Sequence, residues 1–227
     1  MKGLRLLLAV LLAVGLAHTA LASAEMELVS GGSTVIITDN GVGDLDSTVG
    51  TITYSNTNLN GWVISVTSGT SDSPGVDPFG IDLTSLTATC GSTQPCSSDP
   101  LQVWFSDTGF NVGAPGFQSD YSATITGSTA STSQTAWVTN ANTIFGTGSL
   151  IGTVGPFTST NHGSVFGGGA GVPLYSLTLE QIFTAGGHSA SFSADGNITA
   201  VPEPGAVVLL GTALVLCASG LRRKRVS

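Results

Sequence analysis

The chain of 227 residues has six Lys or Arg residues against fourteen Asp or Glu residues, and its formal net charge is −8 at pH 7. All six basic residues lie near the two ends, so the stretch 25–201 contains thirteen acidic residues and no Lys or Arg. This composition excludes nucleic-acid binding by that stretch, because such binding depends on Lys and Arg contacts to phosphates. Divalent cations are the one class of partner that the charge favours.

The first 24 residues have the three parts of a secretory signal peptide. Lys2 and Arg5 come before an apolar run over 6–17, and the small residues Ala22 to Ala24 follow it. This order predicts export and cleavage between Ala24 and Glu25. The apolar run is only twelve residues long, which is short for a membrane span.

Residues 25–200 show the period-two alternation of half-buried β-strands. Turn residues separate the alternating segments, which lie at 26–29, 34–38, 51–54, 62–67, 79–86, 101–105, 121–126, 135–138, 175–179 and 190–194. This pattern predicts an all-β domain, an antiparallel β-sandwich that could take a jelly-roll-like form. We expect one helical turn near 179–183, a polar loop at 127–134 and long glycine-rich loops over 142–172.

Two cysteines lie close together in this exported domain. Cys90 and Cys96 are separated by five residues that include Gly91 and Pro95, which predicts a tight turn closed by a disulfide. A redox pair is the weaker alternative, because the spacing is not C-x-x-C.

One acidic loop is a candidate calcium site. Asp39, Asn40, Asp44 and Asp46 place side-chain oxygens beside flexible glycines, and calcium prefers six to eight oxygen ligands. The loop does not match the EF-hand pattern, and Asp, Asn and Gly are also the usual turn residues. Calcium is therefore the one candidate cofactor, and a plain turn is the alternative.

The sequence contains no recognisable catalytic motif, so we expect a protein that is not an enzyme. His162 and His188 lie in glycine-rich stretches without a nucleophile motif around them. The thirteen acidic residues leave a glycan hydrolase open as an alternative, since that chemistry needs two carboxylates. Trp62, Trp104 and Trp137 fall within strand patterns, so we expect most of them to lie in the core. The alternative is that two of them face outward together and form a platform for stacking a sugar.

The last 27 residues have three parts. Val201-Pro202-Glu203-Pro204 is a rigid extended tetrapeptide, because each proline fixes its own φ and restricts the residue before it. Residues 205–221 carry no charge and, as a helix, would span about 25 Å. The basic cluster that follows consists of Arg222, Arg223, Lys224 and Arg225. We therefore predict a transmembrane helix at 205–221, with the basic tail 222–227 on the cytoplasmic side.

This three-part tail resembles the PEP-CTERM sorting signal of Gram-negative bacteria. The resemblance covers only residues 201–227, and the family of the domain at 25–200 is not recognised from it. It implies that an exosortase, a membrane protease-transpeptidase, recognises the tail and cleaves near 201–204. It also implies an inner-membrane precursor that is later transferred to the cell surface or the exopolysaccharide matrix. The sequence therefore predicts an exported surface or matrix protein with a structural body, and the alternatives are a calcium- or carbohydrate-binding module and a glycan-active hydrolase.

Overall fold

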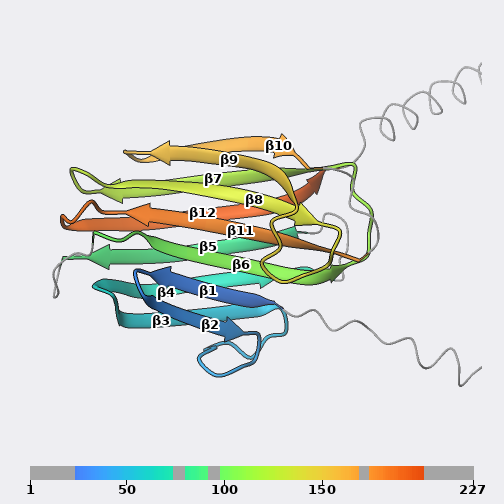
Figure 1. Cartoon of the computed structure of the whole chain (residues 1–227), viewed down its shortest axis with the longest axis horizontal. Helices are drawn as coiled ribbons and strands as arrows, with labels where there is room; N and C mark the ends of the chain where they lie inside the picture. The colour runs from blue at the N-terminus through green and yellow to red at the C-terminus, as the bar shows by residue number, and fades with distance from the viewer. Residues whose placement is uncertain (1–23, 74–79, 92–97, 169–173, 202–227) are drawn as a thin grey trace, which may run out of the picture.

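The structure is a computed structural model that describes residues 24–73, 80–91, 98–168 and 174–201 (Figure 1). These parts contain twelve β-strands: β1 (Glu25–Ser30), β2 (Ser33–Thr38), β3 (Thr51–Leu59), β4 (Trp62–Ser71), β5 (Gly80–Cys90), β6 (Leu101–Phe110), β7 (Gly116–Thr126), β8 (Ser131–Thr139), β9 (Ser149–Phe157), β10 (Asn161–Gly167), β11 (Tyr175–Thr184) and β12 (Ala190–Val201). The predicted signal-peptide core, Cys96 and the tail from Pro202 onward lie outside the described residues. In the part of the chain that is described, no helix has the length and apolar character to cross a membrane.

The strands form two antiparallel sheets of six strands each. Sheet A has the order β2-β1-β6-β11-β8-β9, and sheet B has the order β10-β7-β12-β5-β4-β3. Figure 1 shows the two sheets stacked with their strands nearly aligned, with β9 and β10 at one edge and β2 and β3 at the other. This arrangement confirms the predicted all-β antiparallel sandwich.

Alternation along each strand builds the core between the sheets. In β12, Ala190, Phe192 and Ala194 are buried, whereas Ser191 and Ser193 between them are exposed. Successive side chains of a strand point to opposite faces, so one face of each sheet packs inward and the other faces solvent. The inward aromatic rings pack on one another across the core, as in the contact between Phe183 of β11 and Phe192 of β12, whose centroids are 5.3 Å apart.

The prediction of long loops over 142–172 was wrong, because β9 and β10 occupy most of that stretch. The glycines that suggested loops lie where these two strands pack against each other. A Cβ on Gly152 would come within 2.6 Å of Val165 Cγ2, and one on Gly163 within 2.9 Å of Val154 Cγ1. Glycine therefore permits the close approach of β9 and β10 that closes this edge of the sandwich.

Two smaller predictions also fail. The expected helical turn at 179–183 lies inside β11, which pairs with both β6 and β8, so the ladders on both sides engage its backbone. The expected polar loop at 127–134 is shorter than predicted, because β8 begins at Ser131. Its alternate residues Thr132 and Gln134 are polar but buried, so hydropathy alone did not show the alternation.

Candidate functional site

The predicted sorting and disulfide residues are described only in part. Val201 is the last residue of β12, where it pairs with Gly116, and Ala24 is fully buried at the start of the described chain. Cys90 ends β5, but its predicted partner Cys96 lies outside the described residues, as do Ala22, Pro202 to Pro204 and Arg222 to Arg225. The disulfide and the sorting signal therefore stay predictions.

The acidic loop uses its carboxylates to hold its own backbone. Asp44 Oδ1 accepts hydrogen bonds from the N–H groups of Asp46 and Thr53, each at 3.0 Å, and Asp44 Oδ2 accepts one from the N–H of Asn40 at 2.9 Å. Asp39 Oδ2 accepts one from the N–H of Gly50 at 2.9 Å. The bond from Asp46 has the spacing of an Asx turn, and the other bonds join parts of the loop and of β3 that lie further apart in the sequence.

Asp46 Oδ1 also accepts a hydrogen bond from a backbone group, the N–H of Thr48, at 2.7 Å. This bond lowers the pKa of the Asp46 carboxyl. Among the described residues, no group of three or more His, Cys, Asp or Glu side chains is placed to hold a metal ion. Calcium binding by Asp39, Asn40, Asp44 and Asp46 stays a prediction, and the turn function of these carboxylates is what the geometry shows directly.

One polar pocket on the outer face of sheet B brings together residue types that elsewhere form a catalytic triad. His162 of β10 is opposite Ser122 of β7, and Ser122 is opposite Asp195 of β12, in a pocket of about 340 Å³. The triad mechanism needs the histidine between the other two, so that it takes the serine proton while the aspartate orients it. Here the serine is in the middle, so the row does not have the geometry of that mechanism.

A second pocket of about 150 Å³ on sheet B surrounds Asp82 of β5, with Asn197 of β12 opposite it. Burial raises the pKa of Asp82 to about 6, and the nearby carboxylates of Asp195 and Asp72 add to the effect. No polar hydrogen-bond partner satisfies Asp82 Oδ1 in the described part of the chain. The pocket is therefore acidic, and its central carboxyl is easily protonated.

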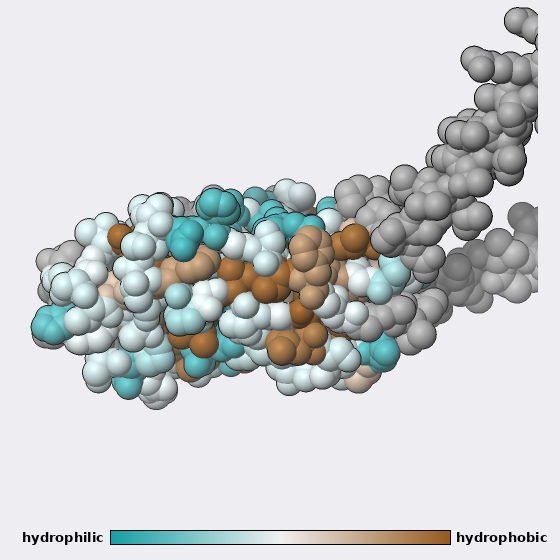
Figure 2. Space-filling view, turned by 90° about the horizontal axis from the view of Figure 1, so that it is seen from above, coloured by the Kyte–Doolittle hydropathy of each residue, from teal (hydrophilic) through white to brown (hydrophobic). Residues whose placement is uncertain are grey.

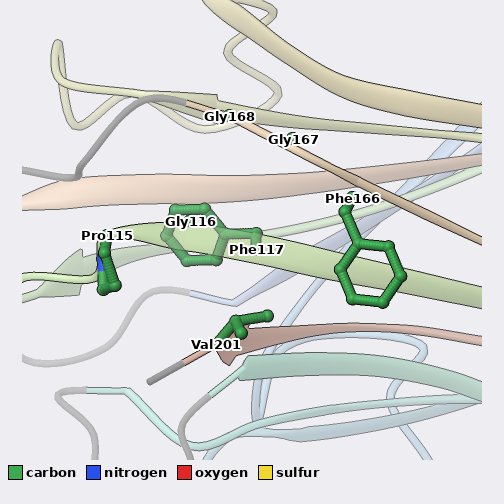
Figure 3. Close-up of a pocket in the computed structure, with 7 residues that line it drawn as sticks. All are labelled: Pro115, Gly116, Phe117, Phe166, Gly167, Gly168 and Val201. Carbon is green, nitrogen blue, oxygen red and sulfur yellow. The ribbon is translucent and has the colours of Figure 1, made fainter. Parts of the chain in front are cut away.

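A third pocket lies where β12 ends, and its lining is apolar (Figure 3). It has a volume of about 330 Å³, and the side chains of Pro115, Phe117, Phe166 and Val201 surround it. Phe166 is 67% exposed. Figure 2 views the edge of the sandwich formed by β9 and β10 from above, and it shows apolar residues gathered along the middle of this edge. Among the described residues, none with a titratable side chain lines this pocket, and those that do line it offer apolar contact.

The tryptophans separate into one buried residue and an outward pair. Trp62 is fully buried against Phe192 in the core. Trp104 of β6 and Trp137 of β8 lie on the outer face of sheet A, because their strand neighbours, such as Val103 and Val138, point into the core. The two indole rings stack with their centroids 5.5 Å apart and their planes 11° apart.

The indoles of this Trp104–Trp137 pair meet above β11, the strand between them. β6 and β8 are both neighbours of β11, so the two backbones are about two strand spacings, or roughly 9.6 Å, apart. Ring centroids 5.5 Å apart therefore require both side chains to lean inward over β11. Below them, Thr178 is opposite Trp137 and Glu180 is opposite Trp104.

Glu180 is the functional group that the sequence reasoning did not single out. It points away from the core, since Gln181 beside it reaches inward, yet only 8% of its surface is exposed. Its side chain makes no hydrogen bond within the described residues, and burial raises its pKa to about 7. The sequence signal that could have shown it is the single acidic residue in the otherwise uncharged strand β11.

The pair and the carboxyl together form a site suited to sugar binding. Indole faces stack on the apolar faces of sugar rings, and a carboxyl can bond to sugar hydroxyls. A hydroxyl group also lies beside the pair on β8, where Thr135 is opposite Glu180. The Thr135 hydroxyl is hydrogen-bonded to the hydroxyl of Thr153 on β9, with the two Oγ1 atoms 3.2 Å apart. We call Trp104, Trp137 and Glu180 the indole site.

No protein-family model matches the chain, and no curated protein matches it in sequence. Three solved structures give weak similarity in fold. A Clostridium thermocellum endo-1,4-beta-D-xylanase, solved as its CBM22-1 and GH10 modules with xylohexaose, is 13% identical with a TM-score of 0.33, over 64% of this chain and 27% of that one. This chain thus spans about a quarter of the length of that xylanase structure.

The other two structures are carbohydrate-binding modules. A family 6 module is 15% identical with a TM-score of 0.25, over 67% of this chain and 93% of that one. A module of the β-sandwich superfamily is 12% identical with a TM-score of 0.31, over 80% and 73% of the two chains. Similarity at this level assigns neither a family nor a ligand to this chain.

Proposed function

We propose that this chain is an exported cell-surface or exopolysaccharide-matrix protein whose β-sandwich binds carbohydrate at the indole site. The observation that supports the binding function is the Trp104–Trp137 pair, two large aromatic side chains stacked on the solvent face of a sheet rather than in the core. An outward pair has no role in packing the two sheets together. Ring stacking against a sugar supplies affinity for this site, because aromatic side chains contribute large contact areas at low entropic cost.

The body is proposed to bind rather than to hydrolyse glycans. Glu27 and Glu180 lie in one cross-strand row on the outer face of sheet A, but Trp104 lies between them. A glycosidase needs the space between its two carboxylates for the sugar and, in inverting enzymes, a water. The Trp104 indole fills part of that space, so stacking is the chemistry this row supports.

Replacing Trp104 or Trp137 by alanine is expected to weaken binding to polysaccharide at least tenfold, since loss of a stacked ring removes its contact with the sugar. Affinity gel electrophoresis of the chain expressed without 1–24 and 202–227, against a panel of soluble polysaccharides, measures the effect. Phe166→Ala is the matched control, because Phe166 is an exposed aromatic residue outside the indole site. It lies on β10, an edge strand of sheet B, whereas the indole site lies on sheet A. Equal retardation of all three variants and the parent by every polysaccharide that binds would contradict the assignment.

The delivery of the protein is proposed to follow its two terminal signals. Export removes residues 1–24, and an exosortase-like protease then processes the inner-membrane precursor near Val201 to Pro204. We expect the protein recovered from the cell surface to have a mass that starts at Glu25 and ends near residue 204. Intact-mass spectrometry measures this directly, and a recovered chain that still contains Arg222 to Arg225 would argue for a permanent anchor.

A further inference from the structure

Glu180 is flanked by side chains on the outer face of sheet A, and little of it is exposed. Its neighbours on β6 and β8 in the cross-strand row are Trp104 and Thr135, and the indoles of Trp104 and Trp137 close above β11. Backbone ladders on both sides hold β11 itself in place. Only 8% of Glu180 is exposed, so its carboxyl has a narrow contact with solvent. For more water to reach the carboxyl, the two indoles are the groups that can move.

Among the residues that the structure describes, no Lys or Arg faces Glu180 from any element around it. The outward residues of β6 and β8 near it are uncharged, and so is the connection 140–148 that packs on this face through the bond from Phe145 N–H to Ser106 Oγ. Asp107 lies further along β6, and Glu25 and Glu27 lie on β1, one strand beyond Trp104. Of the two described histidines, His162 belongs to sheet B and His188 lies in the connection between β11 and β12.

An ionised Glu180 in this position has no favourable partner except water. Desolvation strongly disfavours a buried carboxylate that has neither a donor nor a cation beside it, and burial is the cause of the raised pKa of Glu180. A protonated Glu180 pays much less. Ionisation therefore favours a conformation in which more water reaches the carboxyl and the indoles no longer close over it.

We propose that the indole site is proton-gated, an inference that rests on the carbohydrate-binding function proposed above. With Glu180 protonated, Trp104 and Trp137 stack and present one platform to a neutral glycan. With Glu180 ionised, water enters beneath the indoles, the pair separates and the platform is lost.

Two further observations define the ligand and the pH range. The domain has thirteen acidic residues and no Lys or Arg over 25–201, so its field repels polysaccharides that carry carboxylate or sulfate groups. The glycan is therefore neutral. Because burial raises the pKa of Glu180 to about 7, the change between the two states is centred near neutral pH.

The test compares binding of hydroxyethyl cellulose, a neutral polysaccharide, and alginate, an acidic one, at pH 5.5 and pH 8.5. We expect the parent domain to bind the neutral polysaccharide about tenfold more tightly at pH 5.5 than at pH 8.5, and alginate at neither. Glu180→Gln keeps a neutral side chain of the same shape, so its affinity is expected to be the same at both pH values. Asp82→Asn is the control, since it removes the raised carboxyl on sheet B and is expected to leave the gate intact.

Tryptophan fluorescence without a glycan separates the gate from the proposed function. The emission maximum of the parent is expected to shift to longer wavelength between pH 6 and pH 8 as the indoles become hydrated, and that of Glu180→Gln to stay constant. A pH-dependent shift of the emission maximum without any glycan binding would support the proton-dependent movement of the indoles and overturn the proposed binding function. Binding that is independent of pH, or stronger at pH 8.5, would overturn the gate while the binding function stands.

Discussion

Gly196→Ala is expected to lower the free energy of unfolding by about 3 kcal/mol, because the new methyl group would occupy space that a buried amide now fills. A Cβ on Gly196 would overlap Gln134 Oε1 and would lie 2.6 Å from Gln134 Cδ and 2.8 Å from Gln181 Nε2. Gly196 is buried in β12, next to the irregularity at which the pairing with β5 shifts register. The clash is steric, since Gly196 does not have a positive φ.

The amides that would have to move are held in a network that joins the two sheets. Gln134 Nε2 donates to Ser119 Oγ at 2.9 Å and to the carbonyl of Asp120 at 2.8 Å, both on β7 of sheet B. Gln181 Nε2 donates to Gln134 Oε1 at 3.0 Å. All three side chains are at most 1% exposed. Displacing them would leave buried donors and acceptors unsatisfied, which costs more than the overlap itself.

Urea unfolding of the domain 25–201 measures the effect. Gly32→Ala is the matched control, because Gly32 has no heavy atom within 4 Å of an added Cβ and does not have a positive φ. The double variant Gly196→Ala/Gln134→Ala should be less destabilised than the sum of its single variants, since removing the Gln134 amide makes room for the methyl group. Additive losses, or a Gly196→Ala domain as stable as the control, would show that the network does not constrain this position.

The sequence predicted the sandwich well where hydrophobic and polar residues alternate and poorly where they do not. The segments predicted as strands at 62–67, 101–105 and 190–194 all lie within strands of the structure. β9 and β10 were missed because glycine occupies positions where two strands of different sheets meet closely. Gln134 and Gln181 were missed as core residues because their burial depends on partners on other strands.

The indole site could be predicted only in part. The alternation of Val103, Trp104 and Phe105 already places Trp104 on the face opposite the core residues, and the same reasoning applies to Trp137. Sequence alone does not give the strand order, so it could not show that β11 lies between the two tryptophans or that Glu180 lies beneath them. The acidic loop could be picked out as a calcium candidate or a plain turn, but the N–H groups that donate to its carboxylates could be identified only from the three-dimensional turn.

The stability of the domain is expected to fall as the pH rises from about 4.5 to 7, by about 3 kcal/mol from Glu180 alone. Burial raises the pKa of Glu180 from 4.5 to about 7 in the folded chain. Between these two values the unfolded chain has lost the proton that the folded chain still holds, so each rise in pH favours unfolding. Above pH 7 both states are ionised, and the effect of this group becomes constant.

Nothing in the domain supplies the opposite trend through ion pairs with basic side chains. Many proteins lose stability in acid because carboxylates paired with Lys or Arg become protonated, but residues 25–201 contain no Lys or Arg. Asp82 acts in the same direction as Glu180, since its pKa is raised from 3.8 to about 6. Acidification also relieves the repulsion among the remaining carboxylates.

Glu180→Gln separates the contribution of this one group from the general charge effect. At pH 8 the variant is expected to be more stable than the parent by about 3 kcal/mol, because the ionised carboxyl and its desolvation cost are both removed. At pH 4.5 the two should differ little, since Glu180 is protonated in the folded parent. Urea unfolding at pH 4.5, 6, 7 and 8 gives both curves. Glu27→Gln removes a more exposed carboxyl from the same face, and an equal stabilisation by that substitution would show that the effect comes from net charge rather than from the burial of Glu180 beneath the indoles.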